Sequence, residues 1–235
     1  MSGYRYVLMD LDGTMSDSAP GILDSLRLAF AEVDVPWVDD ETARTLLGPP
    51  FWHSLPPLVG EDKLPAVVAA YRQHYVLGEA MFRTTCYDGV TELLDGLVEQ
   101  GIQLAVATSK PEPHAARIVD HLGLSGYFQT ICGDTVDGLL GSKALVVGEA
   151  LARLGSPPAA QVLMVGDRSH DVLGAAAHGL KCAGALWGYG SAAELTAAGA
   201  LRLCATPAEV LDVVASARLD PAARPDPAAR LDPAG

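Results

Sequence analysis

YVLMDLDGT, residues 6–14, joins a short apolar run to two aspartates, Asp10 and Asp12. An uninterrupted apolar run that ends in a turn signal is typical of a strand buried on both faces of a sheet. Two carboxylates so close in the chain repel each other unless a cation or a shared proton relieves the repulsion. A turn at Asp12-Gly13 with Asp10 as a cap is the alternative interpretation, and the rest of the chain decides between the two.

Apolar runs and helical segments alternate along most of the chain. The predicted strands are 6–9, 104–107, 130–132, 162–165, 182–186 and 201–204, and the predicted helices include 91–100, 113–122, 143–154 and 172–178. Strands that alternate with helices imply right-handed crossovers, so we expect an α/β fold with a doubly wound parallel sheet. Ligands of such a sheet bind beyond the carboxyl ends of its strands.

One segment interrupts this alternation. From about residue 15 to residue 85 the apolar residues follow helical spacing, and no strand is evident. They form two stripes: Ile22, Leu26, Ala29, Phe30 and Val33, then Leu64, Val67, Val68, Tyr71 and Tyr75. We therefore predict a small α-helical cap domain, 15–85, inserted into a Rossmann-like core of residues 1–14 and 86–217. There it would cover the carboxyl edge of the sheet as a lid; an ordinary packing subdomain is the alternative.

The final segment, 218–235, is a repeat. Arg, any residue, Asp, Pro, Ala and a small residue recur from Arg218, Arg224 and Arg230. Each unit is charge-neutral, has little to bury and carries an Asp-Pro step that disfavours helix at the Asp. We predict a disordered tail, with a docking motif as the alternative.

Composition and charge narrow the class of protein. Apolar residues make up 49% of the 235-residue chain and charged residues 19%, as in globular proteins. The net charge of −13 argues against nucleic acid or an anionic membrane as a partner, so an anionic substrate would need a local device such as a metal ion. No apolar run approaches the roughly 18 to 20 residues of a membrane span, and the chain starts without a secretory signal pattern, so we expect a cytoplasmic protein.

The cysteines suggest neither a zinc site nor a disulfide framework. Cys86, Cys132, Cys182 and Cys204 are far apart and include no CxxC pair. We expect them to be small buried hydrophobic residues.

A second acidic pair follows another predicted strand. The run 162–165 leads into Asp167 and Asp171. Because the carboxyl ends of parallel strands meet at one edge of a sheet, these acids are expected near the first pair. In the alternative interpretation, Asp167 and Ser169 only cap the helix that follows.

Hydroxyls and cations complete the set of candidate site residues. The run 104–107 leads into Thr108, Ser109 and Lys110, which offer hydroxyls, a loop amide and a cation. Lys143 stands at the start of a predicted helix, where a lysine does little for the helix because a helix N-terminus is already positive. We therefore expect Lys143 to have another partner.

Taken in chain order, these four elements, at residues 10–14, 108–110, 143 and 167–171, resemble the haloacid dehalogenase superfamily of aspartate-dependent phosphatases. The resemblance covers nearly the whole chain before the tail. The helical insertion after DGTMSDSAPGI (12–22) is similar to the subfamily whose lid lies between the first and second motifs. ATSKP (107–111), GDRSHD (166–171) and WGYGS (187–191) are closest to its phosphoglycolate phosphatase-like members. That label covers many substrates, so we expect a small phosphorylated metabolite as the substrate. We expect the protein to be a monomer or a homodimer.

The resemblance implies roles for the acids. Asp10 would be the nucleophile that forms an aspartyl phosphate, because an ionised carboxylate needs no separate base. Asp12 would be the general acid and base. Mg²⁺ would be held by Asp10, the backbone carbonyl of Asp12 and Asp167, with Asp171 acting behind them or through water.

The resemblance also implies a phosphate site. Thr108, the amide of Ser109 and Lys143 would neutralise the phosphoryl oxygens. Lys110 is a possible stand-in for Lys143, although the family motif favours the later lysine.

The residue two places after the nucleophile separates the family's chemistries. Dehalogenases of the superfamily lack an acid there and the ion-pumping ATPases carry a lysine, whereas this chain has Asp12. Phosphonoacetaldehyde hydrolysis needs an imine-forming lysine in the lid, whose lone lysine is Lys63, in a segment expected to be exposed. Phosphoester hydrolysis remains, and a phosphosugar mutase would share every residue named so far.

Substrate choice is expected to reside in the cap. His53 could meet a polar substrate group and Arg72 a carboxylate, although both also fit ordinary buried or surface positions. Trp52 or Phe51 could stack on a base, which leaves a nucleoside 5'-monophosphatase as an alternative, and Trp52 and Tyr75 could equally be core. A non-catalytic binding protein on the same fold is a further alternative, which the intact acids count against.

Overall fold

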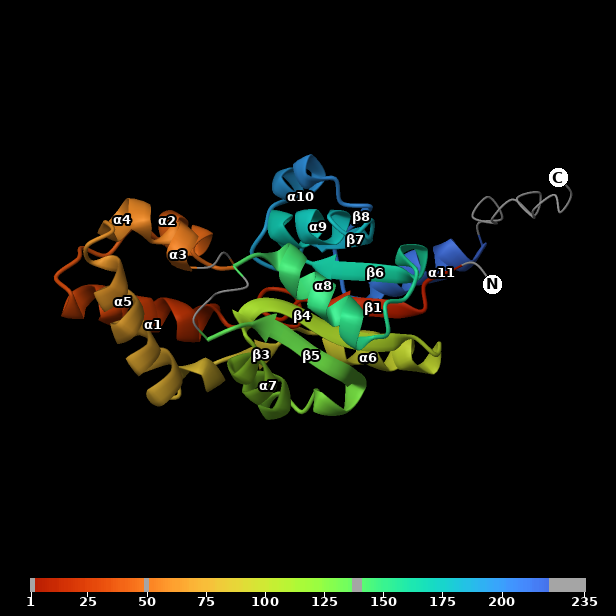
Figure 1. Cartoon of the computed structure of the whole chain (residues 1–235), viewed down its shortest axis with the longest axis horizontal. Helices are drawn as coiled ribbons and strands as arrows, with labels where there is room; N and C mark the ends of the chain where they lie inside the picture. Colours follow the sequence, from red (N-terminus) through yellow and green to blue (C-terminus); the bar gives the residue numbers. More distant parts are fainter. Residues whose placement is uncertain (1–2, 49–50, 137–140, 220–235) are drawn as a thin grey trace, which may run out of the picture.

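A six-stranded parallel sheet forms the centre of the protein (Figure 1). The computed structural model describes residues 3–48, 51–136 and 141–219. The strand order is β5-β4-β1-β6-β7-β8, so the chain builds one half of the sheet outward from β1 and then the other half. The expected doubly wound α/β fold is confirmed. These strands are β1 (Tyr6–Met9), β4 (Gln103–Pro111), β5 (Phe128–Asp134), β6 (Val162–Gly166), β7 (Lys181–Ala185) and β8 (Arg202–Cys204).

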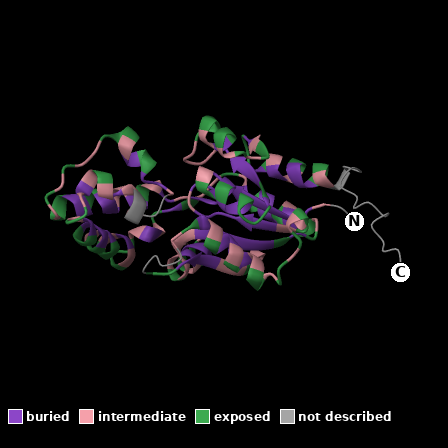
Figure 2. Ribbon diagram, turned by 45° about the horizontal axis from the view of Figure 1, so that its top comes forward, coloured by how far each residue is buried: buried purple, intermediate pink, exposed green. Residues whose placement is uncertain are grey.

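Helices cover both faces of this sheet. Successive side chains of a strand point to opposite faces: Val7 and Met9 of β1 pack with α6, α7 and α11, whereas Leu8 packs with α8, α9 and α10. Figure 2 shows the buried residues concentrated in the strands and the exposed ones on the outer sides of the helices. The core helices are α6 (Val90–Glu99), α7 (Glu112–His121), η3 (Ser125–Tyr127), α8 (Lys143–Arg153), η4 (Ala159–Gln161), α9 (Ser169–Ala176), α10 (Ala192–Ala198) and α11 (Ala208–Leu219).

A group of helices forms the cap at the carboxyl end of β1, the end away from the N-terminus in Figure 1. The first apolar stripe lies on α1, and the second lies on α5 and on η1, which carries Tyr75; α1 packs against both. Val33 follows the end of α1 and is exposed in part. The cap elements are α1 (Ala19–Glu32), α2 (Asp40–Thr45), α3 (Phe51–Ser54), α4 (Pro56–Val59), α5 (Leu64–Arg72), the π-helix η1 (Gln73–Leu77) and η2 (Ala80–Phe82).

The expectation that no strand occurs between residues 15 and 85 is wrong. Two short strands, β2 (Ser16–Asp17) and β3 (Thr85–Cys86), pair antiparallel where the chain leaves the core for the cap and returns. Two residues are too few to show a period, so the sequence carries no signal for them. The proposed boundaries of the cap, 15–85, stay a prediction.

The structure describes only the first two residues of the predicted tail, and it describes all four cysteines. α11 runs to Leu219, two residues into the predicted tail, and the rest of that tail lies outside the described residues. Cys132, Cys182 and Cys204 are buried, as expected, and Cys86 is half-buried. No helix in the described part of the chain has both the length and the apolar character to cross a membrane.

Candidate active site

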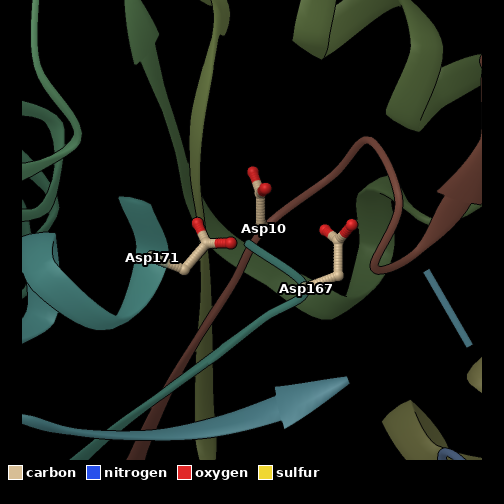
Figure 3. A group of neighbouring side chains, drawn as sticks. All are labelled: Asp10, Asp167 and Asp171. Carbon is tan, nitrogen blue, oxygen red and sulfur yellow. The ribbon is translucent and has the colours of Figure 1, made fainter. Parts of the chain in front are cut away.

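Three aspartates meet where the two halves of the sheet diverge. Asp10 follows β1 and Asp167 follows β6, which are neighbouring strands, and Asp171 lies in the first turn of α9. In Figure 3 their side chains point to the same side, and one carboxylate oxygen from each lies within 4.8 Å of the others. All three are buried. This is the position in an open α/β sheet at which ligands bind.

Lys143 supplies a positive charge to this cluster. Its Nζ lies 2.7 Å from Oδ1 of Asp10 and 2.7 Å from Oδ1 of Asp171. Burial opposes the charge on Lys143, but the two carboxylates raise the pKa of its ammonium above the ordinary value. The partner expected for this lysine is therefore the carboxylate cluster.

One lysine does not compensate three buried carboxylates. Burial, together with Asp171 and Asp12, raises the pKa of Asp10 to about 7 in spite of Lys143. Burial, followed by the charges of Asp171 and Asp10, holds the pKa of Asp167 well above its usual range. A further cation would relieve this repulsion, and carboxylate oxygens are the ligands that Mg²⁺ prefers. The residues present therefore fit a divalent metal ion.

The loops after β7 and β1 hold Asp167 in place. The backbone N–H of Tyr189 donates to Oδ2 of Asp167 at 2.8 Å, and the Thr14 hydroxyl donates to Oδ1 at 3.0 Å. Gly188 packs so closely on Asp167 that a side chain there would collide with it. Thr14 and Tyr189 were not predicted as site residues, although they lie in the motifs DGTMSDSAPGI and WGYGS.

Asp171 has a second role. Its Oδ2 accepts a hydrogen bond from the backbone N–H of Arg168 at 3.0 Å, an arrangement that caps α9. The alternative interpretation named Asp167 and Ser169 as the caps, whereas the capping carboxylate is that of Asp171, whose other oxygen faces Lys143. Ser169 is the first residue of α9, and its backbone N–H donates to Glu194.

A second lysine lies beside Asp12. Lys110 Nζ is 3.0 Å from Oδ2 of Asp12 and donates a hydrogen bond of 2.8 Å to the hydroxyl of Tyr75 in the cap. Burial opposes its charge, but Asp12 and Tyr75 raise the pKa of Lys110 above the ordinary value. The two lysines therefore serve different carboxylates, which the sequence alone did not reveal.

A cavity of about 150 Å³ lies between cap and core. Its core side includes Asp10, Asp12, Thr108, Ser109 and Lys110, so the structure brings these predicted residues together. The cap side is largely apolar and carries three rings that contact one another: Phe51 meets Tyr71 edge-on at 4.6 Å, and Tyr71 stacks on Tyr75 at 5.0 Å between centroids.

The candidate specificity residues differ in placement. Arg72 lines the cavity, and its Nη2 donates to the carbonyl of Val136 at 2.7 Å. His53 belongs to α3, but its side chain lies outside the described residues. Lys63, expected to be exposed, is only partly so, because its Nζ donates to the carbonyls of Val33 and Asp34 at the end of α1.

Comparison with known proteins gives several named relatives. The chain is 44% identical over 189 residues to a tyrosine-protein kinase, PtkA, from Mycobacterium tuberculosis, an alignment that covers 80% of this chain and 64% of that one. It is 34% identical to a 5'-nucleotidase from Pseudomonas aeruginosa, with 91% and 96% covered. It is 31% identical to a phosphoglycolate phosphatase from Aquifex aeolicus, with 79% and 86% covered. The match thus spans only 64% of the length of the mycobacterial relatives.

A solved structure and a family model agree on the fold. The structure of a predicted phosphatase from Clostridium acetobutylicum superposes with a TM-score of 0.86 at 34% identity, covering 92% of this chain and all of the other. Residues 7–185 match the family described as haloacid dehalogenase-like hydrolase, and this range contains every acid and both lysines of the site. The chain therefore belongs to the haloacid dehalogenase-like hydrolase family.

Proposed function

We propose that this chain is a magnesium-dependent phosphatase that hydrolyses a small phosphate monoester through an aspartyl phosphate on Asp10. One observation carries the proposal. Of the described residues, Asp10 alone belongs both to the cluster of three aspartates and to the lining of the cavity. A substrate in the cavity therefore meets the carboxylate that also faces the candidate metal site.

The residues around Asp10 suit two successive phosphoryl transfers. A carboxylate oxygen of Asp10 would attack phosphorus while the bond to the leaving oxygen breaks, and Asp12 would give that oxygen a proton. Water would then attack phosphorus, Asp12 would take its proton, and the bond to Asp10 would break. The acid and base thus return to their starting states.

Positioning and charge stabilisation account for the remaining roles. The Thr108 hydroxyl, the Ser109 amide and Lys143 would bind the phosphoryl oxygens. Mg²⁺, held by Asp10, Asp167 and the carbonyl of Asp12 with Asp171 close by, would supply positive charge to the transferred group. Tyr189 and Thr14 would keep the Asp167 carboxylate oriented.

The substrate is proposed to be a phosphoglycolate-like acid or a sugar phosphate, in line with the phosphoglycolate phosphatase relatives. The cavity supports a nucleoside 5'-monophosphate as a second candidate. Its cap wall contains the rings of Phe51, Tyr71 and Tyr75, which suit a flat base, and a relative named 5'-nucleotidase aligns over 96% of its own length.

A panel assay tests the proposal. Phosphate release from 2-phosphoglycolate, sugar phosphates, nucleoside monophosphates and p-nitrophenyl phosphate is measured with Mg²⁺ and with excess chelator. We expect release that needs Mg²⁺ and falls on the order of 10³-fold or more in Asp10→Asn. Full activity in the chelator or in Asp10→Asn would contradict the proposal.

Two further arms cover the other transfers. Isomerisation of a phosphosugar without release of phosphate would identify a mutase. Transfer of phosphate from ATP to a tyrosyl peptide would match the name of the mycobacterial relatives. Either result in place of hydrolysis would mean that the phosphoryl group passes to an acceptor other than water.

A further inference from the structure

Lys110 joins the cap to the core through three contacts. Its ammonium is 3.0 Å from Oδ2 of Asp12, donates to the hydroxyl of Tyr75 at 2.8 Å, and lies 4.7 Å from the centroid of the Tyr75 ring. The Lys110 side chain is only 7% exposed and that of Asp12 13%. A buried cation is costly unless it is paired, so Lys110 depends on partners from both parts of the molecule.

The cap presents Tyr75 from an unusual piece of backbone. Tyr75 lies in the π-helix η1, which continues α5. A π-turn inserts a residue and changes the direction of the side chains that follow, and such turns are frequent at functional sites. The Tyr75 ring also stacks on Tyr71, which meets Phe51, so it is held by packing within the cap.

The contact leaves one oxygen of Asp12 available. Oδ2 faces Lys110, whereas Oδ1 is buried without a hydrogen-bond partner among the described residues. Asp12 lines the cavity together with Lys110 and Tyr75. Oδ1 is thus the oxygen of Asp12 that lacks a partner in this structure, and in the proposed reaction the leaving oxygen or the attacking water would supply that partner.

We propose that Lys110 is a positioning residue for Asp12. When the cap is closed, Tyr75 holds the ammonium of Lys110, and Lys110 in turn holds Oδ2 of Asp12 so that Oδ1 faces the leaving oxygen. This inference rests on the proposed phosphatase function. Opening of the cap removes the hydroxyl and the ring from Lys110, and the carboxylate of Asp12 then loses its fixed orientation. Proton transfer is in this way confined to the closed arrangement.

Two substrates that differ in their leaving group test the proposal. Phenyl phosphate and p-nitrophenyl phosphate have similar shapes, but phenolate is the poorer leaving group and needs the proton from Asp12 more. In Lys110→Met we expect kcat/KM to fall on the order of 10²-fold for phenyl phosphate and less than about tenfold for p-nitrophenyl phosphate. Tyr75→Phe, which keeps the ring, should shift the same ratio in the same direction but less, and Lys110→Arg should restore part of it.

Matched variants and a second measurement complete the design. Lys181→Met, at the amino end of β7, and Tyr127→Phe, whose hydroxyl donates to Asp95, should leave the ratio unchanged. Equal losses for both esters would mean that Lys110 binds phosphate or only supports the fold, and no loss would mean that it is dispensable; either outcome overturns the proposal.

Hydrogen exchange separates this inference from the proposed function. Lys110→Met and Tyr75→Phe should speed exchange in residues 71–77 and 108–111, and Tyr127→Phe should not. Unchanged exchange in these variants would overturn the proposed role of the Lys110–Tyr75 contact, whatever their activity. A wild-type protein that releases no phosphate from these esters or from any substrate of the panel would contradict the phosphatase, while the exchange result would still decide whether Lys110 and Tyr75 connect the cap to the core.

Discussion

At the scale of single residues, the site depends on where each lysine places its charge. Lys143 faces Asp10 and Asp171, and Lys110 faces Asp12. Removing one partner of a buried ion pair leaves an uncompensated charge, which costs far more than the net contribution of the pair. The two lysines are therefore expected to matter for stability as well as for phosphate binding and proton transfer.

Lys143→Met should lower the free energy of unfolding by about 3–5 kcal/mol, because Asp10 and Asp171 would remain buried without their cation. Urea denaturation at pH 8 without metal checks this, with the exposed Lys181→Met as the control. A loss below about 1 kcal/mol would show that the carboxylates do not need this lysine.

At the scale of elements, the junction between core and cap is organised by Tyr189. Its hydroxyl accepts from the backbone N–H groups of Ser18 at 2.8 Å and Ala19 at 3.0 Å, and donates to Oδ1 of Asp17 at 3.1 Å. The N-terminus of α1 is thus capped from the loop after β7, while the backbone of the same tyrosine holds Asp167. Tyr189 therefore stabilises both the start of the first cap helix and the candidate metal site.

Tyr189→Phe should destabilise the protein by about 1–2 kcal/mol, because the N–H of Ser18 loses its acceptor and the N–H of Ala19 retains Oδ1 of Asp17 at 3.2 Å but loses the hydroxyl. The backbone bond to Asp167 persists in this variant. Chemical denaturation measures the loss, and faster hydrogen exchange at Ser18 and Ala19 should accompany it. Unchanged exchange there, or an equal loss in Tyr127→Phe, would count against the role of this hydroxyl.

Elements with several turns or a buried face were predictable, and very short ones were not. The strand 6–9 matches β1, and the helix predicted at 143–154 is α8, Lys143–Arg153. α9 begins at Ser169, earlier than the predicted 172, because the Asp171 carboxylate caps the N–H of Arg168. The π-helix η1 continues the apolar spacing of α5, so periodicity did not distinguish it.

At the scale of the whole molecule, the acidic cluster couples pH, metal and stability. The pKa of Asp10 is raised to about 7, and that of Asp167 is raised as well, both first of all by burial. A carboxyl whose pKa is higher in the folded than in the unfolded state stabilises the fold fully below the unfolded value, and this contribution is lost as the pH rises through the folded value.

We therefore expect the Tm of the metal-free protein to fall between pH 5 and pH 8. Mg²⁺ should raise Tm more at pH 8 than at pH 5, because it binds the ionised carboxylates. Asp10→Asn should weaken both effects. Thermal melts with Mg²⁺, and with NaCl at equal ionic strength, check this; a metal-free Tm that is flat or rises with pH, or equal shifts by both salts, would contradict it.

The sequence by itself determined the doubly wound sheet and the positions of the acids along it. Apolar runs and strand-end motifs such as YVLMDLDGT are local signals, because a buried strand needs consecutive apolar residues and its loop follows directly. The tertiary structure alone decided which lysine meets which aspartate, and that Tyr75 and Tyr189 join the site from distant segments. Such pairings depend on the direction of side chains from separate elements, and residue spacing along the chain carries no information about that direction.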